Sequence, residues 1–327
     1  MLHRFTRTSR ALRQAACVTL LIGGALSGGA SRALDNDADV YAAGATPAGT
    51  NLAPVYYQYA ERDKVRANGN TVAKGSLRLD VAILRFVRFV DIFGYRADPQ
   101  VLIPLGKLKA SDEIASLGSC DGLADPIVAA TIWLANKPAE GEFFGITPGI
   151  YVPLGGYDKN RALNLGENRW KYLLQTGWTT PLGNSGLSLQ LSGDVTLFGK
   201  NDEFGPNSQT LKQKPLYQLQ AWLMHPIDPS FDVRIGTSHF TGGRTEVDGV
   251  ENDDWTKTTN LKLGFAWGFA PGWNFLALYG RDLSVHNGPA GIQSAEFPVA
   301  EGLLKRDTGE FQKGRRDMRK LIEPGFG

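Results

Sequence analysis

The sequence predicts an all-β fold, an antiparallel transmembrane β-barrel preceded by a signal peptide. Apolar residues alternate with small or polar residues over segments of about ten residues, as strands between two environments require. Long polar loops follow alternate segments and short turns follow the others, which is the asymmetry of an outer-membrane barrel. Aromatic residues recur at segment ends, where a membrane interface favours them. We count about eleven strands and a possible twelfth after Asn287, and expect twelve because such barrels close with an even number.

Residues 1–33 have the pattern of an export signal. Four arginines between Arg4 and Arg13 precede a short apolar run, Cys17 to Leu26, and small residues ending at Ala33 suit a signal peptidase. A retained membrane anchor is the alternative, but about ten apolar residues are too few for a helix across ~30 Å of hydrocarbon. The pattern predicts export to the outer membrane. Residues 34–49 then read as a flexible leader or a short plug.

The charge of the processed chain argues against a nucleic-acid partner. Removing residues 1–33 takes away five arginines and no acidic residue, so the formal net charge changes from +2 to −3. Of the two cysteines only Cys120 remains, which excludes an intrachain disulfide.

The barrel is expected over residues 50–300, and its first half is the less regular. A charged loop over Glu61–Asn70, a bulge and tight turn near Arg88, and a long loop over Gly106–Ala124 separate the first strands. In order, the strands expected in this half are Val55–Tyr59, Leu77–Ile83, Asp91–Leu105, Ile127–Leu134 and Phe144–Val152.

The second half alternates more cleanly, with long loops over Leu154–Arg169, Gly199–Pro215 and Gly242–Asp254. Its strands are expected to start at Trp170, Leu187, Tyr217, Phe231, Leu261 and the residues after Pro271-Gly272. In Leu187–Leu197 every leucine faces one way and Gln190 with its polar neighbours faces the other. Leu263–Gly280 is apolar enough to suggest a helix, but Pro271-Gly272 at its centre favours a hairpin.

The polar rows of these strands supply the candidate lumen and solute contacts. One interpretation is a lined passage in which polar groups orient a solute and Tyr151 or Trp222 contacts its ring. The other is a packed interior whose charges satisfy one another. Both signs of charge occur, which does not suggest a strongly ion-selective pore. The candidates are Arg78, Asp80, Tyr151, Gln190, Asp194, Gln218, Gln220, Trp222, Asp232, Arg234 and Lys262.

No catalytic, metal or cofactor site is predicted. Ser238 and His239 are neighbours on a strand and point to opposite faces, so they cannot form a dyad. His225 and His286 lie at loops. The acidic segment Glu246–Asp254 lacks the spacing of a calcium loop. Asp158 and Arg169 bracket one long loop and either pair across the mouth or belong to a solvated loop.

Four motifs carry a resemblance to a bacterial outer-membrane family known as phenol meta-pathway degradation-like. They are G-L-A-D-P (122–126), P-L-G-G-Y-D (153–158), N-L-G-E-N-R-W (164–170) and D-L-S-V-H-N-G (282–288). The resemblance implies a barrel of twelve strands associated with uptake of hydrophobic or aromatic compounds. Ala290 to Gly327 departs from it, because members resembling this chain end in one more alternating strand with a terminal aromatic, whereas this end is mixed and basic and finishes in the basic tail 301–327.

The predicted function is therefore passive uptake of a small hydrophobic or aromatic solute through an outer-membrane channel that is not an enzyme. Expected partners are outer-membrane lipid and lipopolysaccharide, the solute and the barrel-assembly machinery. The alternatives are a structural or adhesive barrel acting through its loops, a lipid-acting barrel enzyme using His239 and His286, and a soluble periplasmic sandwich.

Overall fold

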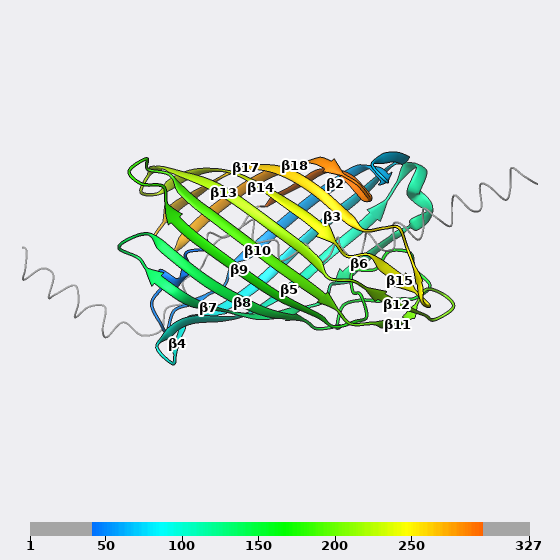
Figure 1. Ribbon diagram of the computed structural model, residues 1–327, viewed down its shortest axis with the longest axis horizontal. Coiled ribbons are helices and arrows are strands. Elements are labelled where there is room, and N and C mark those ends of the chain that lie inside the picture. Colours follow the sequence, from blue (N-terminus) through cyan, green and yellow to red (C-terminus); the bar gives the residue numbers. More distant parts are fainter. Residues whose placement is uncertain (1–40, 297–327) are drawn as a thin grey trace, which may run out of the picture.

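Twelve long antiparallel strands close into a barrel in the computed structural model, which describes residues 41–296 (Figure 1). The predicted signal peptide and the basic tail lie outside the described residues. The barrel strands are β2 (Val55–Ala67), β3 (Asn70–Arg88), β5 (Tyr95–Ala110), β7 (Ile127–Lys137), β8 (Glu142–Tyr151), β9 (Lys171–Pro181), β10 (Ser188–Phe198), β13 (Leu216–Asp228), β14 (Phe231–Gly242), β17 (Thr256–Ala270), β18 (Trp273–Val285) and β19 (Gly288–Glu296).

The barrel closes where its last strand meets its first. β19 begins directly after Asn287, as predicted, and pairs with β2 from Gly288 opposite Arg66 to Glu296 opposite Gln58. Every other barrel strand pairs with its neighbour in sequence. Closure leaves no free sheet edge, so backbone N–H and C=O groups can be paired where the wall meets lipid. The predicted fold class is confirmed.

Shorter elements lie at the two ends. A small sheet of β11 (Asn201–Phe204), β12 (Gln209–Gln213), β15 (Thr245–Val247) and β16 (Val250–Glu251) lies at the end with the long loops (Figure 1). By the asymmetry of such barrels, this is the extracellular end. The remaining elements are the 3-10 helices η2 (Ala43–Ala45) and η3 (Asp112–Leu117) and the strands β1 (Asn51–Leu52), β4 (Val90–Ile92) and β6 (Ser119–Leu123).

The first hairpin is longer than the sequence pattern suggests. β2 continues to Ala67, so most of the expected charged loop Glu61–Asn70 is strand. The chain reverses at Asn68 and Gly69, both with positive φ (51° and 78°), the geometry of a two-residue hairpin turn. The next tight turn is at Phe93-Gly94 rather than near Arg88. The loop expected from Gly106 begins only after Ala110.

The later strands follow the predicted alternation. On β10, Leu191 and Leu197 are exposed on the outer wall, whereas Gln190 and Ser192 are buried inside. β17 and β18 form a hairpin across Pro271-Gly272, so the helical alternative for Leu263–Gly280 is wrong. Among the described residues, no helix combines the length and apolarity needed to cross a membrane.

Exposed aromatic side chains lie near both ends of the outer wall. Trp170 and Tyr172 lie at the start of β9 near the long loops. At the opposite end Phe269 packs between Trp267 and Trp273, with ring centroids 5.6 and 6.2 Å apart. Such girdles are expected where a barrel wall meets the membrane interfaces.

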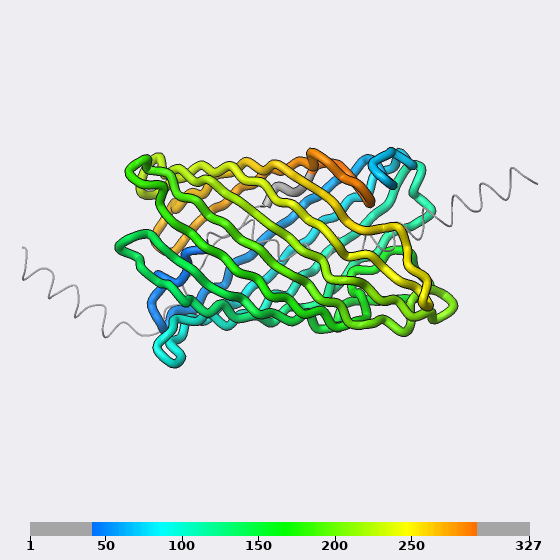
Figure 2. Tube along the Cα trace, in the orientation of Figure 1, coloured from blue at the N-terminus to red at the C-terminus, as the bar shows by residue number. Residues whose placement is uncertain are grey.

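The chain before β1 runs inside the barrel. The Tyr41 backbone N–H donates to Gln190 Oε1 (2.6 Å), and Thr179 Oγ1 donates to the Tyr41 carbonyl (2.9 Å). The Tyr41 ring fills the space over Gly177, where a Cβ would lie 2.3 Å from a ring carbon. The described part of the leader therefore lies in the lumen. The tube in Figure 2 shows this blue segment entering the barrel at the end opposite the long loops.

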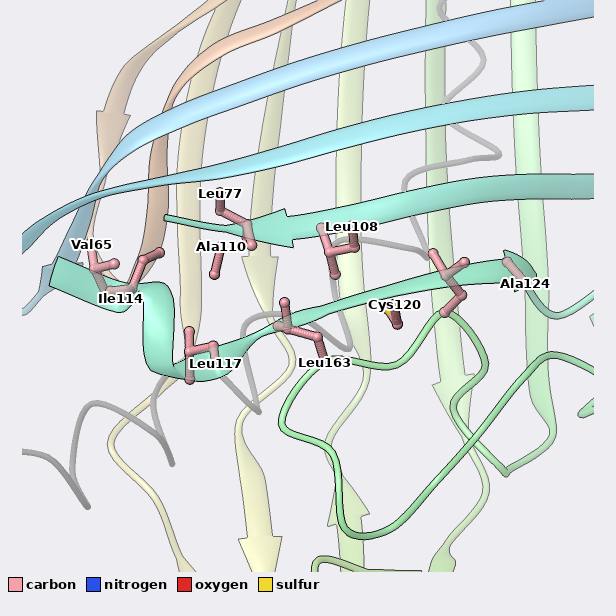
Figure 3. Packing of buried hydrophobic residues seen from close by; sticks show 10 residues of the cluster. Val65, Leu77, Leu108, Ala110, Ile114, Leu117, Cys120, Ala124 and Leu163 are labelled. Carbon is pink, nitrogen blue, oxygen red and sulfur yellow. The ribbon is translucent and has the colours of Figure 1, made fainter. Parts of the chain in front are cut away.

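A separate apolar cluster supports the extracellular end. Figure 3 shows Ile114 and Leu117 of η3, Cys120 of β6 and Leu163 of the 152–170 loop packed against the ends of β3 and β5. Leu163 is only 1% exposed. The long loop is therefore folded onto the barrel by its own apolar side chains, and burial of each contributes about 1.5–3 kcal/mol.

Candidate functional site

One side of the inner wall carries an apolar cluster, set among buried polar residues such as Gln100, Thr131 and Gln175. Its buried side chains come from six neighbouring strands and pack together across the lumen side of the sheet. They are Tyr56 of β2, Val81 and Ile83 of β3, Leu102 of β5, Ile127 of β7, Tyr151 of β8 and Leu173 of β9. We refer to these residues as the apolar half.

The other half is polar, and a chain of hydrogen bonds runs across four strands. Ser192 Oγ on β10 donates to Gln220 Oε1 on β13 (3.1 Å), and Gln220 Nε2 donates to Ser238 Oγ on β14 (3.4 Å). Ser238 Oγ in turn donates to Asn260 Oδ1 on β17 (3.1 Å). We call the inward polar residues of β10, β13, β14 and β17 the polar half.

Nine of the eleven predicted lumen residues lie on the inner wall. Asp194 and Asp232 are half-buried there, the latter paired with Arg234 at 2.6 Å. Trp222 packs with Ala266 and Leu276, next to the hydrogen-bonded chain. The buried members are Tyr151, Gln190, Gln218, Gln220, Trp222, Arg234 and Lys262.

Arg78 and Asp80 are the exceptions, and their assignment to the lumen is wrong. β3 pairs with β5 residue by residue from Leu77 opposite Ala110 to Val87 opposite Gln100. Arg78 and Asp80 therefore share the face of Phe86, which is 50% exposed on the outer wall. They pair with each other there at 2.9 Å. The physical reason is that the apolar row of β3, which includes Val81 and Ile83, packs on the lumen side with the other residues of the apolar half.

An inner cavity of about 270 Å³ lies beside the N-terminal segment. Tyr41, Arg85, Asp98, Trp133, Arg234 and Leu276 contribute to its lining. Trp133 Nε1 donates to Asp98 Oδ2 (2.8 Å), and Arg85 Nη1 donates to the Tyr56 hydroxyl (2.8 Å). Arg85, Asp98 and Trp133 were not predicted. Arg85 lies in the run L-R-F-V-R-F-V, whose alternation is hard to assign to one face.

A buried ion cluster lies where the 152–170 loop rejoins the barrel. Glu167 Oε2 accepts from Arg169 Nη2 (2.6 Å), and Glu167 Oε1 accepts from Lys171 Nζ (2.7 Å). Burial alone would raise the pKa of Glu167, but the charges of Lys171 and Arg169 outweigh it and hold that pKa below its usual value. Each cation also lies over an aromatic ring, Phe198 for Arg169 and Tyr151 for Lys171.

The proposed pairing of Asp158 with Arg169 is wrong, and so is the solvated-loop alternative. Asp158 pairs with Arg161 at 3.4 Å and accepts the backbone N–H of Asn160 at 2.9 Å. Arg169 is engaged by Glu167, two residues before it, while the loop between them and Asp158 buries Leu163.

Three of the four sequence motifs meet at this point. Asp125 of the first motif accepts the backbone N–H groups of Gly155 (3.1 Å) and Glu167 (3.0 Å), which belong to the second and third. Burial raises the pKa of Asp125. Gly155 and Gly166 lie backbone to backbone, and a Cβ on Gly166 would be 2.6 Å from the Gly155 carbonyl carbon. The motifs therefore build the extracellular mouth.

A mouth cavity of about 400 Å³ lies above the ion cluster. The 152–170 loop forms one side, and β11, β12 and β15 with the turn between β11 and β12 form the other. Its lining combines the cations Lys159, Arg161 and Arg169 with apolar groups that include Phe204 and Leu211.

The three histidines within residues 41–296, His225, His239 and His286, do not assemble into a site. Ser238 is buried inside, whereas His239 lies on the opposite face with its Nδ1 2.8 Å from Thr259 Oγ1. His225 is exposed, and the His286 ring packs on Trp255. Within residues 41–296, no group of three or more His, Cys, Asp or Glu side chains is arranged to hold a metal ion.

Residues 60–295, more than half of the chain, match the family described as MetA-pathway of phenol degradation. The chain belongs to this family. It is also similar to the COG4313 outer membrane channel from Pseudomonas putida F1, with 31% identity, a TM-score of 0.76, and coverage of 80% of this chain and 99% of that one. No curated protein sequence matches the chain.

The barrel alone is shared more widely. The translocator domain of the autotransporter NalP from Neisseria meningitidis is 12% identical, with a TM-score of 0.50 over 85% of this chain and 95% of that one. At that identity the similarity concerns the fold. Family membership, the closed barrel and the solved channel together establish an outer-membrane β-barrel and confirm the resemblance predicted from the motifs.

Proposed function

We propose that this protein is a passive outer-membrane channel for small hydrophobic or aromatic compounds. The observation that carries the proposal is an inner wall with an apolar cluster on one side and a chain of hydrogen-bonded polar side chains on the other, in a barrel of the phenol-degradation family. A ring can leave water against the apolar half while its polar substituent exchanges hydrogen bonds with the polar half. Similarity to a solved outer membrane channel supports this function.

The solute contacts proposed are Tyr151 in the apolar half and Trp222 beside the polar half, with the buried glutamines and Lys262 orienting polar groups. Passage is downhill, so the function needs no cofactor. We further propose that residues 1–33 direct export, that the barrel-assembly machinery inserts the chain, and that lipid and lipopolysaccharide surround its outer wall.

Flux through the reconstituted protein tests this function. Purified, folded protein in liposomes should speed the entry of phenol above protein-free liposomes and above liposomes holding the heat-unfolded chain. Replacement of Trp222 by Ala should change the rate of phenol entry into these liposomes. Equal phenol entry with folded protein and without protein would contradict the channel function.

A loop-binding or structural role is the second candidate, favoured by the packed extracellular loops and the small sheet beside them. In that case Trp222→Ala leaves solute flux unchanged, whereas deleting the 199–215 loop abolishes binding. Enzymatic action on lipid, a more remote alternative, requires His239→Ala and His286→Ala to abolish phospholipid cleavage. We expect no such cleavage from the wild-type protein.

A further inference from the structure

We propose that the mouth cavity binds the carboxylate of a small aromatic acid, with Arg169 as the donor to the anion. This inference rests on the proposed channel function and names a solute class for it. The site would hold an aromatic anion at the extracellular end before it enters the lumen.

One nitrogen of the Arg169 guanidinium, Nη1, is not used in hydrogen bonds to the described residues. Its Nε and Nη2 donate to Glu167 Oε2, and Nη2 also donates to Gln213 Oε1. The side chain is fully buried, yet within residues 41–296 its Nη1 has no hydrogen-bond partner. Buried donors are nearly always paired in folded proteins, so an unpaired charged donor beside a cavity points to a missing acceptor.

The charges around the cavity favour an anion. Of the lining residues, Lys159, Arg161 and Arg169 are cations, and Glu167 is the acid. Glu167 is already engaged by Lys171 in addition to Arg169. The ammonium of Lys159 donates to a neutral partner, Ser208 Oγ, at 2.7 Å. Arg161 pairs at 3.4 Å with Asp158, which lies outside the lining. With that pair and the Glu167 cluster counted, Lys159 and one of the two cations at Glu167 stay unmatched, so the charge around the cavity is positive.

The rest of the lining favours an aromatic ring rather than a bare inorganic anion. Tyr157 and Phe204 supply aromatic faces, and Leu211 and Val247 supply buried aliphatic surface. The volume of about 400 Å³ lies within the usual range of roughly 300–1,000 Å³ for small-molecule sites. A single free guanidinium arm suits one carboxylate, while the ring rests on the apolar side.

Calorimetric titration of the purified wild-type protein in detergent is the first test. Benzoate, methyl benzoate and acetate separate the two halves of the proposed ligand, because methyl benzoate lacks the charge and acetate lacks the ring. Benzoate should bind at least about tenfold more tightly than either. Methyl benzoate binding as tightly as benzoate would overturn the role of the anion. Acetate binding as tightly as benzoate would overturn the aromatic specificity.

Variants then assign the donor. Arg169→Met should weaken benzoate binding at least about tenfold and leave methyl benzoate binding unchanged. Lys200→Gln is the matched control, since it also removes one positive charge near the mouth but lies outside the cavity, paired with Asp202. If Arg169→Met does not fold, Arg169→Lys keeps a cation for Glu167 and removes the free arm. Benzoate binding unchanged in the folded variant, or weakened equally in Lys200→Gln, would overturn the assignment.

Phenol flux in liposomes separates this inference from the channel function. If phenol enters through the wild-type barrel but benzoate does not bind, the mouth site fails and the channel stands. If phenol does not enter, the channel function itself fails.

Discussion

On β3 the residues that face the lumen are Leu77, Leu79, Val81 and Ile83, whereas on β10 they are Gln190, Ser192, Asp194 and Thr196. Both strands alternate apolar and polar side chains with a period of two. β3 puts its apolar row inside and β10 puts its apolar row outside. Alternation thus shows that a strand lies between two environments, but it does not show whether the apolar row faces the lumen or the lipid.

Filling of the lumen explains the difference. Inside β3 there are protein neighbours, namely the other residues of the apolar half, so apolar side chains gain packing there. β3 is nineteen residues long, whereas a tilted strand needs only about 9–11 residues to cross the hydrocarbon core. Part of the outer face of β3 therefore lies beyond the hydrocarbon. Arg78 and Asp80 stand opposite Lys109 and Lys107 of β5, and Arg78 also stands opposite Glu61 of β2, so charged residues gather on this part of the outer wall. Charged residues are tolerated there.

The apolar half should respond most strongly to loss of side-chain volume. Ile83 is 1% exposed inside, whereas Ile235 is 45% exposed on the outer wall. Ile83→Ala leaves a cavity among fixed neighbours and should lower the free energy of unfolding by about 2–5 kcal/mol. Ile235→Ala should cost less, because lipid chains close over the smaller side chain. Denaturant unfolding in lipid vesicles measures both, and equal losses would contradict the packed interior.

The inner wall of β9, where buried Thr179 lies between the two halves, should respond to loss of a single hydroxyl. Thr179 Oγ1 donates to the Tyr41 carbonyl, so Thr179→Val removes a donor that holds the N-terminal segment while keeping the shape. The unpaired carbonyl should cost about 1–3 kcal/mol. Release of the segment should raise single-channel conductance in planar bilayers.

Thr180→Val is the matched control for that change. Thr180 is the next residue on β9 and faces the other way, with its hydroxyl 3.5 Å from the Pro181 carbonyl. Its conductance should equal that of the wild type. Equal conductance in all three proteins would mean that the Thr179 bond does not hold the segment.

The fold was largely predictable because lipid imposes one rule on every crossing strand. The hairpin at Pro271-Gly272, the twelfth strand after Asn287 and the orientation of β10 all follow from alternation and turn chemistry. The rule ends where strands leave the membrane. β2 continues through Glu61–Ala67 because its partner, not lipid, stabilises it, and its charged sequence resembles a loop.

The mouth was not predictable from local pattern. The sequence pattern suggested that Arg169 pairs with Asp158 at the other end of the loop, but its actual partner is Glu167. The backbone N–H of Glu167 in turn donates to Asp125, which lies 42 positions earlier in the chain. Such a contact depends on how the loop folds over the barrel. The motifs marked the correct residues without revealing their partners, since spacing in sequence carries no distance between loops.

The smallest effects should come from two ion pairs, both of which lie on polar rows that the sequence pattern assigns to the lumen. Asp80 pairs with Arg78 on the outer wall, and Asp232 pairs with Arg234 on the inner wall. Asp232→Asn leaves the guanidinium of Arg234 unneutralised beside the inner cavity that Arg234 lines. The anion-to-cation permeability ratio of the channel, measured in planar bilayers, should therefore rise. Asp80→Asn removes the same charge from the outside and should leave that ratio unchanged. A shift caused by Asp80→Asn but not by Asp232→Asn would mean that the polar row of β3 faces the passage after all, and the division into two halves would have to be abandoned.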